Sequence, residues 1–127
     1  MGYAPRMRFE PAELALLADT VEIEIETAAP DGPSHRTVIW VVVDGGDAFI
    51  RSVRGSSARW YREVAANPEV TIHADGRRLR ANAVPATDPA SIARTSAALE
   101  RKYAGDPEMP SMLDPDILDT TLRLTPA

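Results

Sequence analysis

Alternating apolar and polar residues predict the strands of this chain. In the segment VEIEIE (21–26), apolar residues alternate with glutamates, a period of two that is typical of a strand with one face in the core and the other in water. The segment TVIWVVV (37–43) has apolar residues on both sides, which predicts a central strand. Four more segments predict strands, at residues 48–53, 70–75, 78–87 and 120–126.

Helical spacing predicts three short helices between these strands. Residues 11–19 begin with proline and carry one apolar side. A second helix is expected after Ser56 and Ser57, whose hydroxyls are favourable N-caps, and it should stop at Asn67-Pro68. Residues 88–103 open with an Asp cap and a proline. The following stretch, 104–116, has three prolines and four acids, so we expect an ordered irregular loop, with a lid as one interpretation.

The fold class that these elements indicate is mainly β (α+β): a six-stranded antiparallel barrel with two to four short helices. A chain of 127 residues supports one hydrophobic core, so we expect residues 1–127 to form a single domain. No apolar run is long enough to cross a membrane, and the first residues lack the apolar core of a signal peptide. We therefore expect a cytoplasmic protein without membrane contacts.

Few residues suggest classical catalytic or metal chemistry. The chain has no cysteine, which excludes disulfides, thiolate nucleophiles and cysteine metal sites. His35 and His73 lack a third ligand at metal spacing, so no metal site is predicted. The DGGD segment (44–47) has too few oxygen ligands for a calcium loop and predicts a hairpin turn. There is no G-x-S-x-G nucleophile motif, and the catalytic residues are left unassigned.

The charge distribution is uneven. The net charge is −5, yet residues 51–80 hold seven arginines against three acids, a net charge of +4, and the rest of the chain carries −9. An acidic protein is poorly suited to a long polyanion, so nucleic acid is not an expected partner. A small anionic ligand fits better. The alternative is that these arginines are solvated on an exposed face.

Residues 51–60 indicate where such a ligand would bind. They are expected to form a strand end, a glycine-serine turn and a helix N-terminus, where backbone N–H groups and the helix dipole favour an anion. Arg54 and Arg59 flank the turn, and arginine binds phosphate bidentately. The nucleotide motifs GxxxxGK[ST] and GxGxxG are absent. The pattern therefore predicts a phosphate site that is not a nucleotide P-loop.

The positions of the aromatic residues allow two interpretations. Trp40 lies in an apolar strand, which favours a core position over stacking on a ligand, whereas both remain open for Trp60. Tyr103, Met109 and Met112 are expected to pack in the core, with a pocket wall as the alternative.

The run HRTVIWVVVDGGDAFIRSVRGSSARWYREVAANPEVTI (35–72) resembles the flavin-binding split β-barrel proteins, which include pyridoxamine phosphate oxidases and deazaflavin-dependent nitroreductases. The resemblance covers about residues 36–84 and, more loosely, extends to residue 126. Within that group the chain is most similar to a bacterial domain of unknown function, which shares the order Arg-Thr, Trp, S-x-x-G, W-Y-R and N-P.

The resemblance implies a set of cofactor-binding residues. Arg36, Thr37, Val38 and Ile39 match the strand that lies along the flavin ring, and Ser52 through Gly55 match the end of the next strand. Ser57 and Arg59 match an S-x-K phosphate pair with arginine in place of lysine. Trp60 and Tyr61 match the W-Y of the deazaflavin branch. With Arg54 from the turn, the predicted binding set is Arg36, Thr37, Val38, Ile39, Ser52, Arg54, Ser57, Arg59 and Trp60.

The resemblance also implies a function and a partner. We expect FMN or a deazaflavin coenzyme and hydride transfer to or from a small organic substrate. The segment 28–35 (AAPDGPSH) replaces the glycine- and lysine-rich run of the deazaflavin branch, which favours FMN or no cofactor. The alternatives are a cofactor-free protein that binds a small ligand and a non-redox enzyme that reuses the pocket. Split-barrel relatives are commonly dimers, so a homodimer with a shared pocket is expected.

Overall fold

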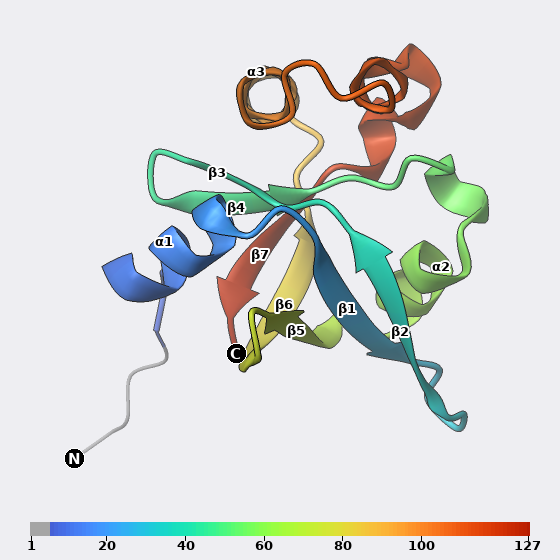
Figure 1. Ribbon diagram of the computed structural model, residues 1–127. Coiled ribbons are helices and arrows are strands. Elements are labelled where there is room, and N and C mark those ends of the chain that lie inside the picture. Colours follow the sequence, from blue (N-terminus) through green and yellow to red (C-terminus); the bar gives the residue numbers. More distant parts are fainter. Residues whose placement is uncertain (1–5) are drawn as a thin grey trace.

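Seven antiparallel strands form one curved sheet in the computed structural model, which describes residues 6–127 (Figure 1). The strands pair in the order β2-β1-β5-β6-β7-β4-β3. This half-open barrel confirms the predicted mainly β antiparallel architecture, whereas the predicted number of six strands is wrong. The bounds are β1 Ile23–Ala28, β2 Ser34–Ile39, β3 Val42–Asp44, β4 Asp47–Ile50, β5 Glu69–Ala74, β6 Arg77–Pro85 and β7 Leu122–Pro126.

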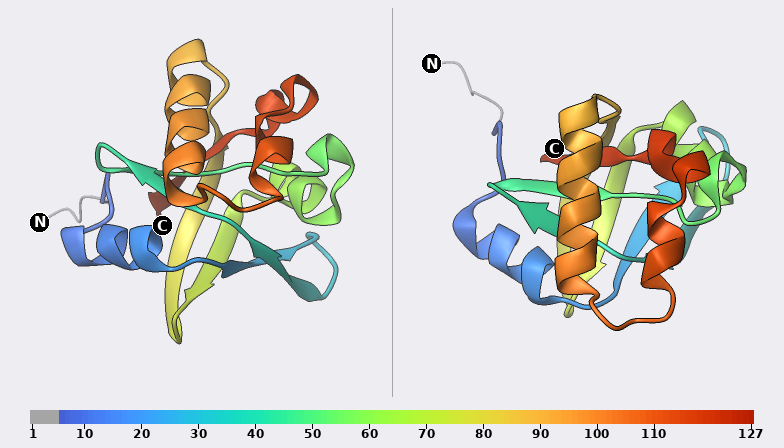
Figure 2. Two further views of the ribbon diagram at one scale, coloured as in Figure 1. Left: turned by 45° about the horizontal axis from the view of Figure 1, so that its top comes forward. Right: turned by 90° about the horizontal axis from the view of Figure 1, so that it is seen from above.

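Three α-helices pack around the sheet. Asp88 caps α3, because its carboxylate accepts a hydrogen bond from the backbone N–H of Ser91 at 3.0 Å. The segment predicted as an irregular loop instead forms 3₁₀ turns, which lie beside α3 on the same side of the sheet (Figure 2). The bounds are α1 Pro11–Asp19, α2 Arg59–Ala66 and α3 Pro89–Lys102, with 3₁₀ turns η1 Gly55–Ser57, η2 Met109–Leu113 and η3 Pro115–Thr120.

The predicted serine cap of α2 is wrong. The N-cap is Ala58, which has no side chain able to accept a hydrogen bond, and the two serines lie in η1. Gly55 has φ +68°, a left-handed conformation that favours glycine and turns the chain into η1. The hydroxyl of Ser57 donates to the carbonyl of Arg54 at 2.9 Å. The first turn of α2 is therefore left without a side-chain cap.

The extra strand arises because the predicted strand 37–43 is broken in two. Its halves belong to β2 and β3, which lie at opposite edges of the sheet, and the link through Trp40 and Val41 joins them. The prediction of a central strand is therefore wrong, and Val38 is 56% exposed. Because β2 and β3 are consecutive in the chain, this link brings the two edges of the sheet towards each other.

Lys102 holds this link in place. Its Nζ donates to the carbonyl oxygens of Val41 at 2.7 Å, Leu17 at 2.9 Å and Thr20 at 2.7 Å. The ammonium group thus joins the strand break to the C-terminal end of α1. Burial lowers the pKa of Lys102 to about 8.

The apolar residues form two clusters. One fills the barrel, and its fully buried members include Ile25, Ile72 and Leu17. The other lies between α3, η2 and the β3–β4 hairpin, and includes Phe49 and Leu99. Each such side chain contributes about 1.5–3 kcal/mol when fully buried. The second cluster is what holds the C-terminal 3₁₀ turns against the sheet.

The DGGD segment forms the predicted hairpin turn between β3 and β4. Gly45 and Gly46 have φ of +57° and +91°, as a two-residue hairpin loop requires. The aspartates on either side form ion pairs with Arg94 of α3. Its guanidinium donates to Asp44 Oδ2 at 2.7 Å and to Asp47 Oδ2 at 3.0 Å. The hairpin is thereby fastened to α3.

We predict that Asp44→Asn lowers the unfolding free energy by about 1 kcal/mol at pH 7. Hydrogen bonding by Arg94 keeps the pKa of Asp44 below its usual value. Its stabilising contribution is therefore complete above the unfolded-state pKa of about 4 and is lost as the pH falls through the lower folded-state pKa. Urea unfolding between pH 7 and pH 2 should show a shallower acid loss in Asp44→Asn than in the wild type. Asp31→Asn, in an exposed loop, is the control and should lose stability in acid as the wild type does. An acid loss in Asp44→Asn as steep as that of the wild type would contradict the prediction.

Candidate functional site

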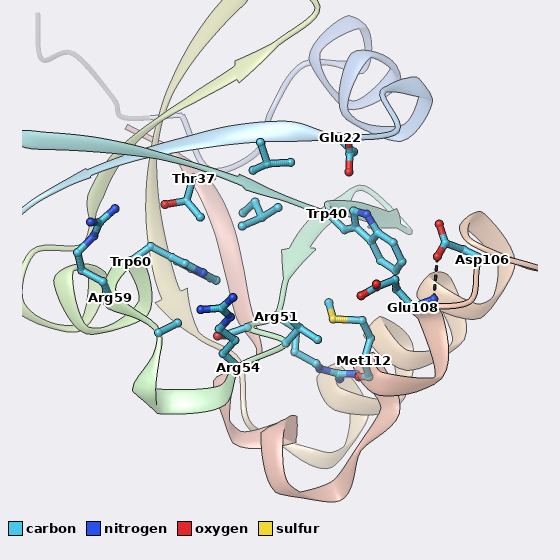
Figure 3. A pocket seen from close by; sticks show the side chains of 15 residues that line it. Glu22, Thr37, Trp40, Arg51, Arg54, Arg59, Trp60, Asp106, Glu108 and Met112 are labelled. Carbon is cyan, nitrogen blue, oxygen red and sulfur yellow. Dashed lines mark hydrogen bonds between the residues drawn. The ribbon is translucent and has the colours of Figure 1, made fainter.

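A cleft of about 740 Å³ opens beside the end of β2 (Figure 3). It is lined by residues 37–40 from β2 and the following link, by 51–54 after β4, by 58–60 at the start of α2, and by side chains from residues 106–112. The volume lies within the range of small-molecule and cofactor sites. The strand break described above shapes this cleft, since it leaves the end of β2 beside the turn that follows β4.

Seven of the nine residues predicted to bind a cofactor line this cleft. They are Thr37, Val38, Ile39, Ser52, Arg54, Arg59 and Trp60.

The other two predicted residues do not line the cleft. Arg36 lies 3.8 Å from carboxylate oxygens of both Glu24 and Glu26. Ser57 is exposed, and its hydroxyl donates to the Arg54 carbonyl. Ser52 lines the cleft, but its hydroxyl donates to the Gly55 carbonyl at 2.8 Å. Ser52 therefore shapes the turn.

One end of the cleft is built to attract an anion. This arginine end consists of Arg54, Arg59 and the first turn of α2. Arg54 points into the cleft and Arg59 lies beyond Trp60 at its rim (Figure 3). Within residues 6–127, the one ion pair of Arg59 is a long contact with Glu63, at 4.0 Å. Because Ala58 provides no side-chain cap, the N-terminus of α2 adds backbone N–H groups and a partial positive charge.

Arg51 has a different role from the one suggested by the arginine-rich sequence. It is 2% exposed, and its guanidinium donates to four neutral acceptors. Burial lowers its pKa to about 10, so it stays charged at neutral pH. It connects the end of β4 to α3, to η2 and to Thr121, the C-cap of η3, rather than offering donors to a ligand. The acceptors are Thr121 Oγ1 at 2.9 Å, Ser96 Oγ at 3.0 Å and the carbonyls of Met112 at 2.9 Å and Ile92 at 3.1 Å.

Two tryptophans lie along the cleft. Trp60 is 6% exposed and belongs to the barrel core. Trp40 is half-buried and stacks on Tyr103, with ring centroids 3.8 Å apart and planes 6° apart. Tyr103 itself is buried behind Trp40 and does not line the cleft, whereas Met112 does. Trp40 thus combines the two interpretations that the sequence allowed, packing on one side and a cleft wall on the other.

The opposite end of the cleft carries negative charge that the sequence did not reveal. Glu22, Asp106 and Glu108 line it around Trp40, and we call these three residues the acidic end (Figure 3). They come from the start of β1 and from the segment before η2. The only sequence signal was the acid-rich stretch at 104–116, which was interpreted as a loop or lid.

The two histidines pair with carboxylates. His35 Nδ1 lies 3.1 Å from Glu63, and His73 Nε2 lies 2.7 Å from Glu26. Within residues 6–127, no group of three or more histidine, aspartate or glutamate side chains could hold a metal ion. In that same range, no helix has the length and apolar character needed to span a bilayer.

Comparison with protein families identifies the class of protein. A family model described as "Uncharacterized protein conserved in bacteria (DUF2255)" matches residues 13–124. The chain therefore belongs to this bacterial family. No curated protein matches it in sequence.

Solved structures share the fold at low sequence identity. One titled "F420 Reductase" is 21% identical with a TM-score of 0.62, covering 89% of this chain and 91% of that chain. A putative pyridoxamine 5'-phosphate oxidase from Listeria innocua is 16% identical, with a TM-score of 0.66 and coverage of 91% and 90%. HutZ, the heme storage protein from Vibrio cholerae, is 16% identical, with a TM-score of 0.64 and coverage of 95% and 92%. These similarities establish the split-barrel fold, and the ligand has to be argued from the cleft.

We predict that Arg51→Ala lowers the unfolding free energy by about 3 kcal/mol or more, because it leaves a cavity and removes the donor from four acceptors that are buried or partly buried. Arg62→Ala, on the exposed face of α2, should change it by less than about 0.5 kcal/mol. Urea unfolding of both variants measures the difference. Equal stability of the two variants would show that the buried guanidinium does not fasten the cleft wall.

Proposed function

We propose that the cleft binds a flavin-type coenzyme, FMN or a deazaflavin, and that the protein is an oxidoreductase acting on a small organic substrate. The observation that carries this proposal is the arginine end, where two arginines and an uncapped helix N-terminus meet in a cleft with tryptophan in its walls. Solved structures with oxidase and reductase titles share the fold, which supports the same proposal.

The residues of the cleft fit such a coenzyme. Arg54 and Arg59 would hold the phosphate, the charged group that bidentate guanidinium groups bind best. Residues 37–39 and Trp60 would provide a wall for a planar ring. The coenzyme would supply hydride chemistry, and the protein would supply orientation and electrostatics. The segment 28–35 has no lysine or arginine for a longer acidic tail, which favours FMN over a deazaflavin.

Heme is a weaker candidate, although one structural neighbour is titled a heme storage protein. Histidine, cysteine, methionine and tyrosine are the usual axial ligands of heme iron. Among the described residues that line the cleft, only Met112 belongs to this group. Its main-chain carbonyl already accepts from Arg51, which restrains this segment.

We predict that FMN binds the purified protein, raises its unfolding temperature and gives it the visible absorption of a flavin. Arg54→Ala and Arg59→Ala should each weaken FMN binding by about tenfold, and Arg62→Ala should leave it unchanged. Riboflavin, which lacks the phosphate, should bind the wild type and the two cleft variants equally well. Calorimetric titration measures these affinities.

Two results would contradict this proposal. A colourless protein that gains no stability from FMN or a deazaflavin would favour a cofactor-free protein that binds a small ligand. FMN affinity that is equal in Arg54→Ala, Arg59→Ala and the wild type would mean that these arginines are solvated surface charges.

We further propose that the protein is a homodimer in which a second copy covers the open side of the cleft. Val38 and Val53 line the cleft and are 56% and 47% exposed, so a second copy that packs here would bury apolar surface from both. Val38 belongs to the proposed ring wall and Val53 precedes Arg54, so a partner at this position would complete the site.

We predict a dimeric mass by light scattering, and a shift towards monomer in Val38→Asp, because a buried carboxylate at the interface is costly. Ala90→Asp, at the exposed N-terminal end of α3, should remain dimeric. A monomeric wild type, or a Val38→Asp variant that dimerises as well as the wild type, would contradict this arrangement.

A further inference from the structure

The acidic end of the cleft is organised around a rigid aromatic surface. Trp40 stacks face to face on Tyr103, and the Tyr103 hydroxyl donates to the carbonyl of Val21 at 2.6 Å. Tyr103 is 4% exposed. One face of the indole is therefore covered by an immobilised ring, and the rest of it is turned towards the cleft. Such a surface can stack against a planar ligand without first being ordered.

The side chains that line this surface at the acidic end are negatively charged, and the ammonium group of Lys102, 5.3 Å from the centroid of the Tyr103 ring, is bound by backbone carbonyls. Within residues 6–127, none of the three carboxylates of the acidic end forms an ion pair with lysine, arginine or histidine. Asp106 Oδ1 accepts a hydrogen bond from the backbone N–H of Glu108 at 2.8 Å, which orients the Asp106 carboxylate. Burial is the main reason that the pKa of Tyr103 rises to about 12, and the charges of Glu22 and Asp106 raise it further. The carboxylates of Glu22 and Asp106 thus contribute a negative electrostatic potential at Tyr103.

We propose that the acidic end binds the positively charged planar part of an organic substrate, in the manner of an N-alkylated heteroaromatic cation lying against Trp40. This inference rests on the proposed function, because the cation would be the substrate placed beside the coenzyme. An aromatic face attracts a cation, and carboxylates around it add attraction that a neutral ligand does not experience.

The opposite charges of the two ends of the cleft would give the coenzyme phosphate and the cationic substrate one orientation relative to each other. Arg54 and Arg59 repel a cation and attract a phosphate, whereas Glu22, Asp106 and Glu108 do the opposite. An anionic substrate at Trp40 would face three carboxylates, which excludes it by like-charge repulsion. The site therefore selects against anionic substrates as well as for cationic ones.

The test compares three probes of similar shape: the cation 1-methylnicotinamide, neutral nicotinamide and anionic nicotinate. Titration calorimetry or ligand-detected NMR at low salt, with and without FMN, should show the cation binding about tenfold more tightly than the neutral probe. Nicotinate should bind most weakly of the three. Equal affinity for the cation and the neutral probe, or preference for the anion, would overturn the proposal.

Variants assign the binding to this end of the cleft. Glu22→Gln and Glu108→Gln should each weaken the cation severalfold without changing nicotinamide binding, whereas Glu100→Gln, on the exposed face of α3, should have no effect. Trp40→Leu should weaken the cation more than Trp40→Phe, which keeps an aromatic face. Cation affinity that is unchanged in both glutamate variants would also overturn the proposal.

The failure of this inference can be distinguished from the failure of the proposed function. Glu22→Gln and Glu108→Gln should bind FMN as tightly as the wild type, and Arg54→Ala should bind the cation normally. If FMN binds and the cation shows no preference, only the present inference fails. If the cation binds as described and FMN does not, the coenzyme assignment fails and the cation site stands as that of a ligand-binding protein.

Discussion

The cleft depends on a buried guanidinium that has only neutral acceptors. Arg51 is 2% exposed, so removing it from water is costly, and its four hydrogen bonds to two hydroxyls and two carbonyls offset that cost. Those bonds join the end of β4 to α3, to the chain at Met112 and to Thr121, which follows η3. The segment that carries Asp106, Glu108 and Met112 contains only short 3₁₀ turns, which are weak structures on their own. Together with the second apolar cluster, Arg51 therefore gives one wall of the cleft a definite position.

A half-buried cation, Lys102, plays a similar role on the other side of the cleft. Lys102 gathers three carbonyls where β2 and β3 separate, and its neighbour in sequence, Tyr103, supports Trp40. One turn of α3 thus positions both the strand break and the aromatic surface beside it. Arg51 and Lys102 have structural roles. Arg54 and Arg59 lie at the cleft and remain available to a ligand. Because Arg51 and Lys102 are used in structural contacts, the charge at one end of the cleft comes from Arg54 and Arg59 and the charge at the other end from carboxylates.

Local signals in the sequence predicted most of the elements, and contacts between distant residues decided the rest. The Asp88 cap and the glycines of the DGGD turn act on neighbouring residues, and both predictions are confirmed. The strand break is held by Lys102, which lies 61 residues from Val41 in the sequence. The local pattern of residues 37–43 therefore did not predict the break. Arg51 looked like its neighbour Arg54 because its acceptors come from remote segments. The acidic end was missed for the same reason, since Glu22 and Glu108 are brought together only by the folded chain.

The seven arginines of residues 51–80 do not form one charged surface. Their separation limits the size of the anion that the protein can bind. Arg77, Arg78 and Arg80 lie on exposed positions of β6, Arg62 on the outside of α2, and Arg51 in the core. Arg54 and Arg59 lie at the cleft as exposed side chains, and three carboxylates lie at its opposite end. A long polyanion would meet repulsion at the acidic end, whereas a small ligand with one phosphate fills the arginine end alone. Because structural neighbours of 16–21% identity share the barrel, it is this local charge pattern, rather than the fold, that limits the chemistry available to the protein.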